Sequence, residues 1–147
     1  MFGRIVVGTD GSDTAKQAVH EAAELAKQTG ATLFVVSAFD PVPPSRLREE
    51  RLEVPADIEH TVGPTEDVDA TLAEAAKAVE SAGVAVQTVA RQGEPADAIL
   101  DVAEEQNADL IVVGNKGMTG AKRFLLGSVP NKVSHHAPSS VLIVRTT

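Results

Sequence analysis

The chain has 147 residues, a formal net charge of −8, four phenylalanines as its only aromatic residues, and no cysteine. This length suits one domain with a substantial core, and the absence of cysteine excludes disulfides, thiolate metal sites and a cysteine nucleophile. An acidic chain with few aromatic residues is a poor candidate for binding nucleic acid. The sequence has neither a signal-like segment nor a run of about 18 apolar residues, so we expect a cytoplasmic protein without membrane contact.

Strand and helix patterns alternate from the start of the chain. Residues 4–8 form a β-branched run that ends in glycine, which predicts a strand covered on both faces. In the turn that follows, over residues 9–12, either Asp10 or Ser12 can cap the next helix. Apolar residues then recur at helical spacing up to Gly30, which stands where a helix would end.

A second buried strand is predicted over residues 31–39, and the character of the chain then changes. The segment 40–64 holds five prolines and a mixture of acidic and basic residues. Because proline blocks regular backbone hydrogen bonding, we predict a flexible insertion here, in which residues 47–52 are able to form one or two helical turns. A lid over a site and an inert insertion are equal alternatives for it. Helical spacing resumes over residues 65–82 and stops at Gly83.

The second half of the chain repeats the alternation. Residues 84–91 alternate between apolar and polar positions, which predicts an edge strand with one wetter face. A helix begins at Gly93-Glu94-Pro95, with proline in its first turn. The apolar run 110–113 predicts another buried strand. A short helix from Ser128 and a last strand over residues 140–145 complete the pattern.

This order of elements predicts a single α/β domain over residues 1–147, built on a doubly wound parallel sheet with helices on both faces. In such sheets, ligands bind outside the carboxyl ends of the strands, at the point where the winding reverses. We place the first and fourth strands at that point. Their ends, at Gly8 and Gly114, should therefore lie side by side and define the site.

Glycines cluster after the fourth strand, at Gly114, Gly117, Gly120 and Gly127, before Ser128 opens a helical pattern. Glycine lets a backbone approach a ligand without a Cβ in the way, and the start of a helix adds unpaired amide donors and the positive end of a dipole. Ser128 can cap that helix. The pattern favours a phosphate site, whereas the alternative is a flexible surface loop.

The charge distribution supports the phosphate interpretation. From Gly114 to the C-terminus there is no acidic residue, although the chain as a whole is acidic. The basic residues of this stretch are Lys116, Lys122, Arg123, Lys132 and Arg145. Such a local bias indicates an anion site, although long loop lysines such as Lys116 and Lys122 are more often solvated than in contact with a ligand.

The spacing Gly114-x2-Gly117-x9-Gly127-Ser128 resembles the nucleotide-binding signature of the universal stress protein family. The resemblance covers nearly the whole chain, from the opening residues 5–12 to the closing residues 141–144. It implies a Rossmann-like fold with five parallel strands in the order 3-2-1-4-5. It also implies a stress-response protein that binds an adenine nucleotide, ATP, at the glycine-rich loop.

The resemblance and the expected fold together single out a set of binding residues. Asp10 is placed to accept hydrogen bonds from ribose hydroxyls, with a role in the turn or as a helix cap as its alternative. Ala38 matches the strand position whose backbone contacts adenine in relatives, and Val113 would pack beside the base or sugar as well as in the core. The full set is Gly8, Thr9, Asp10, Ala38, Val113, Gly114, Asn115, Gly117, Gly127, Ser128 and Val129.

Several functions remain open at this point. Some relatives with a similar start prefer cyclic AMP, and a ligand-independent interaction module is a further alternative. Enzymatic activity is less supported, because the sequence lacks a Walker lysine pattern, a Ser/His/Asp set and an obvious arginine finger. We therefore expect no catalytic residues and at most slow ATPase or autophosphorylation activity.

Two further expectations concern metals and partners. The adjacent His135 and His136 would point about 100° apart on a helix and make a poor metal pair, so we predict no protein metal site, although Asp10 can serve a Mg²⁺ that accompanies ATP. The last strand, within residues 140–146, is an apolar run whose open edge would pair with a second copy. Relatives use this strand for a twofold contact, which implies a homodimer.

Overall fold

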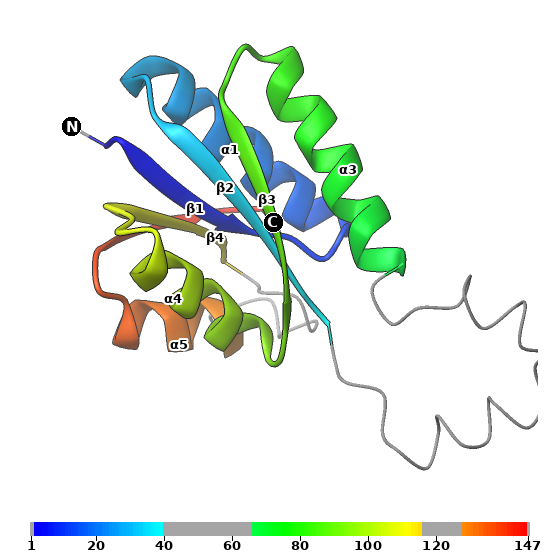
Figure 1. Ribbon diagram of the computed structural model, residues 1–147. Helices are drawn as coiled ribbons and strands as arrows, with labels where there is room; N and C mark the ends of the chain where they lie inside the picture. Colours follow the sequence, from blue (N-terminus) through cyan, green and yellow to red (C-terminus); the bar gives the residue numbers. More distant parts are fainter. Residues whose placement is uncertain (1, 40–65, 116–127, 147) are drawn as a thin grey trace, which may run out of the picture.

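The computed structural model describes residues 2–39, 66–115 and 128–146, and in these ranges helices and strands alternate along the chain (Figure 1). The strands are β1 (Arg4–Gly8), β2 (Thr32–Phe39), β3 (Val86–Gln92), β4 (Leu110–Gly114) and β5 (Ser140–Val144). The helices are α1 (Asp13–Thr29), α3 (Glu66–Ser81), α4 (Pro95–Glu105) and α5 (Ser128–His136). The predicted insertion, residues 40–64, and the predicted site residues Gly117 and Gly127 lie outside the described residues.

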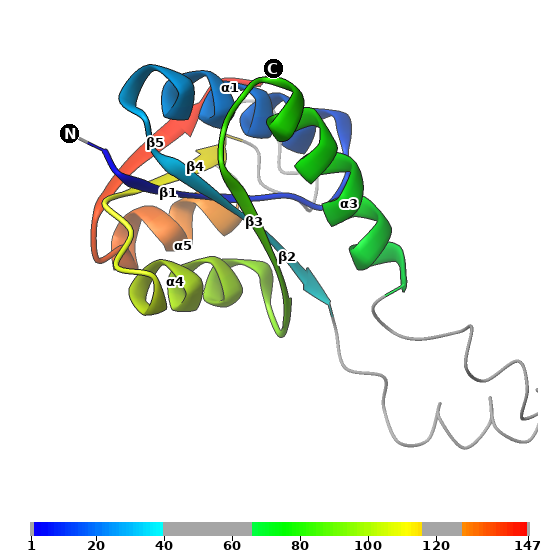
Figure 2. The ribbon, with the colours of Figure 1, turned by 45° about the horizontal axis from the view of Figure 1, so that its top comes forward.

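The described strands form one five-stranded sheet in the order β3-β2-β1-β4-β5, and all of its neighbouring strands are parallel. Helices α1 and α3 cover one face of the sheet, whereas α4 and α5 cover the other (Figures 1 and 2). The strand order and the doubly wound arrangement that the sequence and the family resemblance predicted are therefore confirmed.

Alternate residues of the central strands point to the two faces of the sheet, and both faces are buried. On the side of α1 and α3, the core contains Ile5 and Val7 of β1 with Leu110 and Val112 of β4. On the side of α4 and α5, the core contains Val6 of β1 with Ile111 and Val113 of β4. Each such side chain contributes about 1.5–3 kcal/mol by leaving water. This is why the apolar runs of β1 and β4 show no alternation.

Local capping explains where α1 begins and ends. The Ser12 hydroxyl accepts a hydrogen bond from the Ala15 amide at 3.2 Å, so Ser12, and not Asp10, caps α1. Gly30 ends α1 with a positive φ of 73°, a conformation that suits glycine. Helix α5 begins at Ser128, where the sequence predicted a helix start.

Strand β3 lies at one edge of the sheet, as its alternating sequence predicted, and pairs only with β2 among the described strands. It begins at Val86, two residues later than expected, because Val84 is still hydrogen-bonded to α3. The Val84 amide donates to the Val79 carbonyl at 3.4 Å, and the Val84 side chain is buried in the core beside that helix.

Candidate functional site

The winding of the sheet reverses between β1 and β4. These two strands are neighbours, with Val7 in register with Val112, and the chain continues from β1 to β2 on one side and from β4 to β5 on the other. Their carboxyl ends, at Gly8 and Gly114, therefore lie side by side, as the sequence predicted. This is the position where doubly wound sheets bind ligands.

A narrow crevice of about 20 Å³ opens between these two strand ends. Four predicted site residues line it, namely Gly8, Val113, Gly114 and Val129. The sequence analysis missed its other lining residues, which are Thr14, Ala15, Ala18 and Thr146. The crevice is large enough for about one water molecule, so it is too small to enclose a larger ligand.

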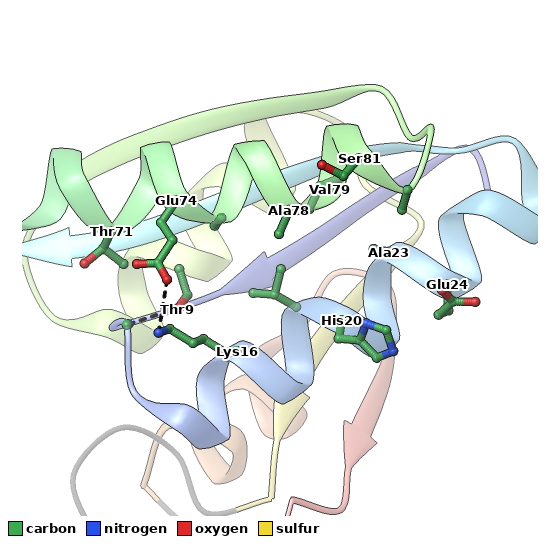
Figure 3. Close-up of a pocket in the computed structure, with 14 residues that line it drawn as sticks. Thr9, Lys16, His20, Ala23, Glu24, Thr71, Glu74, Ala78, Val79 and Ser81 are labelled. Carbon is green, nitrogen blue, oxygen red and sulfur yellow. Dashed lines mark hydrogen bonds and ion pairs between the residues drawn. The ribbon is translucent and has the colours of Figure 1, made fainter.

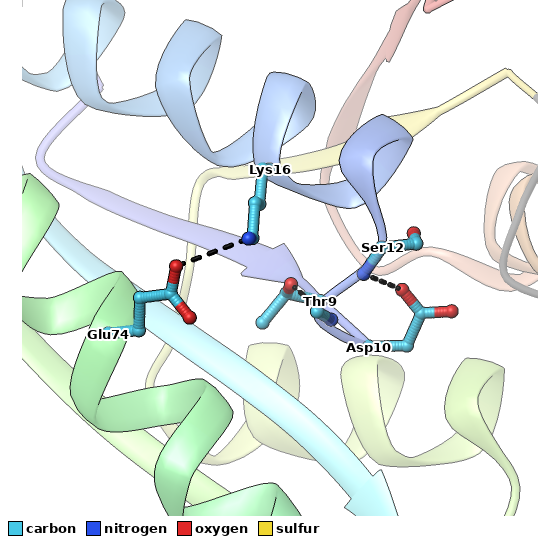
Figure 4. A network of polar contacts seen from close by, with 6 residues as sticks. Thr9, Asp10, Ser12, Lys16 and Glu74 are labelled. Carbon is cyan, nitrogen blue, oxygen red and sulfur yellow. Dashed lines mark hydrogen bonds and ion pairs between the residues drawn. The ribbon is translucent and has the colours of Figure 1, made fainter.

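The turn after β1 is held by two local hydrogen bonds (Figure 4). Asp10 Oδ1 accepts from the Ser12 amide at 2.9 Å, and Thr9 Oγ1 accepts from the Gly11 amide at 3.2 Å. Gly11 has a φ of +83°, which allows the chain to turn sharply away from the sheet. The side chain of Asp10 thus has the turn role that we considered, and it is exposed at the edge of the site.

Strand β2 extends past the end of β1 and leaves backbone groups open beside it. The last register pair between them is Gly8 with Val36, and the Thr9 amide donates to the Val36 carbonyl at 2.9 Å. In a strand, the N–H and C=O groups of successive residues point toward opposite neighbouring strands. The backbone groups of Ala38, two residues after Val36, therefore point toward the β1 side, like those of Val36. If the pairing of β1 with β2 continued, the Gly11 amide would reach the Ala38 carbonyl. In the structure this amide donates to Thr9 Oγ1 instead. No hydrogen bond joins the Ala38 backbone to β1 or to the turn.

Asn115, which follows β4, is bound to the end of β5. Its amide donates to the Val144 carbonyl at 2.8 Å, and its Oδ1 accepts from the amide and the hydroxyl of Thr146 at 2.9 and 3.0 Å. We predicted Asn115 as a donor to phosphate through its side chain or backbone. In the structure its backbone N–H already has a partner, so this prediction is limited to the side chain.

One of the basic residues in the C-terminal part is also committed within the protein. The Lys132 ammonium of α5 lies 2.9 Å from Asp97 and 3.4 Å from Glu94, at the start of α4. The hydrogen bond to Asp97 is the main reason that the pKa of Lys132 is raised. Its charge therefore contributes less to an anion site than the sequence implied. Lys116, Lys122 and Arg123 lie outside the described residues.

The described part of the chain contains no group of three or more His, Asp or Glu side chains arranged to hold a metal ion. His135 and His136 are both exposed at the end of α5. Among the same residues, no helix is both long and apolar enough to cross a membrane.

The sheet order and the site at its switch point define a Rossmann-like α/β domain. The model of the universal stress protein family matches residues 1–145, and the chain belongs to this family. Universal stress protein Rv1636 of Mycobacterium tuberculosis is 39% identical over 147 residues, which cover 99% of this chain and 98% of that protein. The family that the sequence resemblance implied is thereby confirmed.

Solved structures of similar proteins include nucleotide complexes. A universal stress protein in complex with cAMP has 33% identity and a TM-score of 0.75, and the match covers 99% of each chain. The universal stress protein from Archaeoglobus fulgidus in complex with dAMP has 25% identity and a TM-score of 0.69, with 98% of each chain covered. Both proteins share the fold described above.

Proposed function

We propose that this protein is a cytoplasmic stress-response protein that binds an adenine nucleotide, ATP, at the carboxyl ends of β1, β2 and β4. The observation that carries the proposal is the open backbone of Ala38 beside the end of β1. Two similar proteins of the family were solved with adenine nucleotides, cAMP and dAMP, which supports the same class of ligand for this chain.

The Ala38 backbone offers one acceptor and one donor side by side. Its carbonyl is suited to accept from the adenine N6 amino group, and its amide is suited to donate to adenine N1. Guanine presents the opposite pattern at this edge, so it would leave both backbone groups and its own polar groups unpaired. Leaving such groups unpaired is costly. This chemistry would select adenine over guanine without any base-specific side chain.

The remaining predicted residues suit the sugar and the phosphates. Asp10 is exposed beside the turn after β1, and one of its carboxylate oxygens is sufficient for the turn, so the other can accept from a ribose hydroxyl. Gly8 and Val113 supply a closely packed wall. The phosphates would lie over the loop that begins at Gly114 and over the start of α5, near Ser128 and Val129, where backbone donors and the helix dipole favour anions.

Cyclic AMP is the second candidate ligand, because the cAMP complex is the more similar of the two nucleotide complexes described above. The two candidates differ in what the loop must hold: a chain of three phosphates in ATP and a single cyclic phosphate in cAMP. If Mg²⁺ accompanies ATP, Asp10 is the carboxylate that can bind it. In either case the proposed role is binding, with at most slow turnover of ATP.

Titration calorimetry with ATP, cAMP and GTP on the same preparation tests this proposal. We expect saturable binding of at least one adenine nucleotide, and GTP should bind at least about a hundredfold more weakly than ATP. Competition between ATP and cAMP then identifies the preferred ligand. Equal affinity for GTP and ATP would contradict the role of Ala38, and no binding of any nucleotide would favour the ligand-independent interaction module.

We also propose that the protein forms a homodimer through β5. This strand lies at the outer edge of the sheet. Its side chains Leu142 and Ile143 are 40% and 38% exposed, and they are the large apolar side chains that are exposed among the described residues. An open apolar edge strand is suited to pair with a second copy. Residues 140–146 would form the contact.

Sedimentation at micromolar concentration tests the dimer. We expect twice the mass of the 15.3 kDa chain, and Leu142→Lys should give the monomer because it places a charge in the contact. Thr88→Lys is the matched control, since Thr88 is exposed on β3, the opposite edge strand. A monomeric wild-type protein, or equal dissociation by both substitutions, would contradict the proposed contact.

A further inference from the structure

A second cavity in the described part of the chain lies away from the switch point, between α1 and α3. Its volume is about 360 Å³, and Figure 3 shows it running along the groove between the two helices. Its apolar lining comes from both helices and includes Val19, Ala23, Ala75, Ala78, Val79 and Ala82. Cavities of this size are typical of small-molecule sites.

The cavity follows from the small side chains that face each other across the groove. Helix α1 packs over β1 and β4, and α3 packs over β2 and β3, so the sheet determines how far apart the two helices lie. Ala23 on α1, Ala75 and Ala78 on α3, and Ala82 just after α3 are too short to fill the space between the two helices. Val19 and Val79, which are almost fully buried, form its floor.

One end of the cavity is polar and contains a buried hydroxyl group. Thr9, which is 2% exposed, lines this end together with Gly11 and Thr71. Thr9 Oγ1 accepts from the Gly11 amide, whereas its own hydroxyl proton has no acceptor among the described residues. Above this end, Lys16 of α1 and Glu74 of α3 form an ion pair of 3.1 Å across the groove (Figures 3 and 4).

We propose that this cavity binds a small, uncharged, mostly apolar molecule that carries one hydroxyl or carbonyl oxygen. The oxygen accepts a hydrogen bond from Thr9, and the apolar body lies on Val19 and Val79. A carboxylate is disfavoured because Glu74 and Glu24 line the rim and Lys16 is already paired with Glu74. The apolar part of the cavity lies away from the strand ends, between α1 and α3, whereas Thr9 also belongs to the predicted nucleotide-binding set.

The probe for a first test is 2-naphthol, an uncharged aromatic alcohol. The chain has no Trp or Tyr, so the fluorescence of the probe is measured almost without a protein background. We expect saturable binding, and NMR shifts on titration should concentrate on the methyl groups of Ala23, Ala75 and Ala78. Shifts at Gly8 and Gly114 instead, or shifts that do not saturate, would overturn the proposal.

A matched pair of substitutions on α3 tests the location. Ala78→Phe places a ring in the cavity and should lower the affinity for 2-naphthol at least about tenfold. Ala73→Phe adds the same ring at an exposed position of α3 that does not line the cavity, so it should leave the affinity within about twofold. Equal effects of the two substitutions would contradict the site.

The role of the Thr9 hydroxyl is tested with a second pair and a second probe. Thr9→Val removes the hydroxyl but keeps the shape, whereas Thr9→Ser keeps the donor. We expect Thr9→Val to weaken 2-naphthol about tenfold and to leave naphthalene, which has no oxygen, nearly unchanged. Thr9→Ser should bind both probes almost normally. Loss of both probes in Thr9→Val would mean that the turn has changed, and the hydroxyl role would then be rejected.

Discussion

The two ends of the β1–β4 pair differ in how their backbone groups are used. At the amino end, the Asp109 carboxylate accepts from the amides of Gly3 and Arg4 at 2.8 and 3.2 Å, and the Arg4 guanidinium donates to the Gln106 carbonyl at 2.7 Å. At the carboxyl end, both strands stop at glycines, and the backbone of Ala38 has no partner in β1.

This difference separates stability from binding within one pair of strands. Hydrogen-bond donors that are already paired inside the protein stabilise the fold, but they are not available to a ligand. Donors and acceptors left open at the carboxyl end contribute little to stability and can pair with a nucleotide. Substitutions at the amino end should therefore change the free energy of unfolding, whereas those at the carboxyl end should change affinity.

The largest effect is expected at the amino end. Asp109→Ala removes the acceptor of two backbone amides and should destabilise the protein by about 2 kcal/mol, measured by urea unfolding. Asp109→Asn keeps one carbonyl oxygen and should lose roughly half as much. Nucleotide affinity should stay within about twofold of wild type in both variants. A large loss of affinity in a folded Asp109→Ala protein would remove the distinction between the two ends.

The next largest effect is expected at the carboxyl end, at Asp10. Asp10→Asn keeps an oxygen for the Ser12 amide, so the turn and the stability should be retained. The substitution removes the negative charge that strengthens a hydrogen bond from the ribose, and the nucleotide affinity should fall about tenfold. Asp13→Asn, in the first turn of α1, is the control and should bind normally. Calorimetry distinguishes these outcomes, and equal affinities would assign Asp10 to the turn alone.

Much of the fold was predictable because it depends on patterns local in sequence. The β-branched runs of β1 and β4, the cap at Ser12 and the glycine at position 30 each predicted their element. Element boundaries were less predictable, because they depend on partners elsewhere. Strand β3 begins late since the Val84 amide belongs to the end of α3. The strand order came from the family resemblance, because the residues alone leave several orders open.

The crevice at the switch point was predictable where it depends on strand ends, and not where it depends on register. Gly8, Val113 and Gly114 line one crevice as expected, because parallel strands end at the same edge. Thr146 joins them only because Gly114 is in register with Val144, which brings the end of the chain to Asn115. The α1–α3 cavity depends on the distance between two helices, which no sequence pattern gives directly.

A smaller effect is expected from Lys132, which tests whether the basic residues at the carboxyl end serve the ligand. Its ammonium is held by Asp97 and Glu94, so Lys132→Gln should change nucleotide affinity by less than about twofold at low salt. Asp97→Asn, which removes its closer partner, should raise the affinity slightly. A loss of fivefold or more in Lys132→Gln would show that Lys132 leaves its partners for the phosphates.

The smallest effect is expected at the Arg91–Glu105 ion pair, which joins β3 to α4 away from both ends of the β1–β4 pair. The hydrogen bond from Arg91, at 2.6 Å, is the main reason that the pKa of Glu105 is lowered. A carboxylate with a lowered pKa stabilises the fold above its ordinary pKa, near 4.5, and this contribution is lost as the pH falls through the lowered value.

Glu105→Gln should therefore be slightly less stable than wild type at neutral pH, and the two proteins should converge in acid. Urea midpoints measured between neutral pH and the onset of acid unfolding give this comparison. The substitution should leave nucleotide affinity unchanged, because Glu105 belongs to neither end of the β1–β4 pair. A constant difference at all pH values would mean that the pair acts through packing and not through charge, because within the pair only Glu105 titrates in this range.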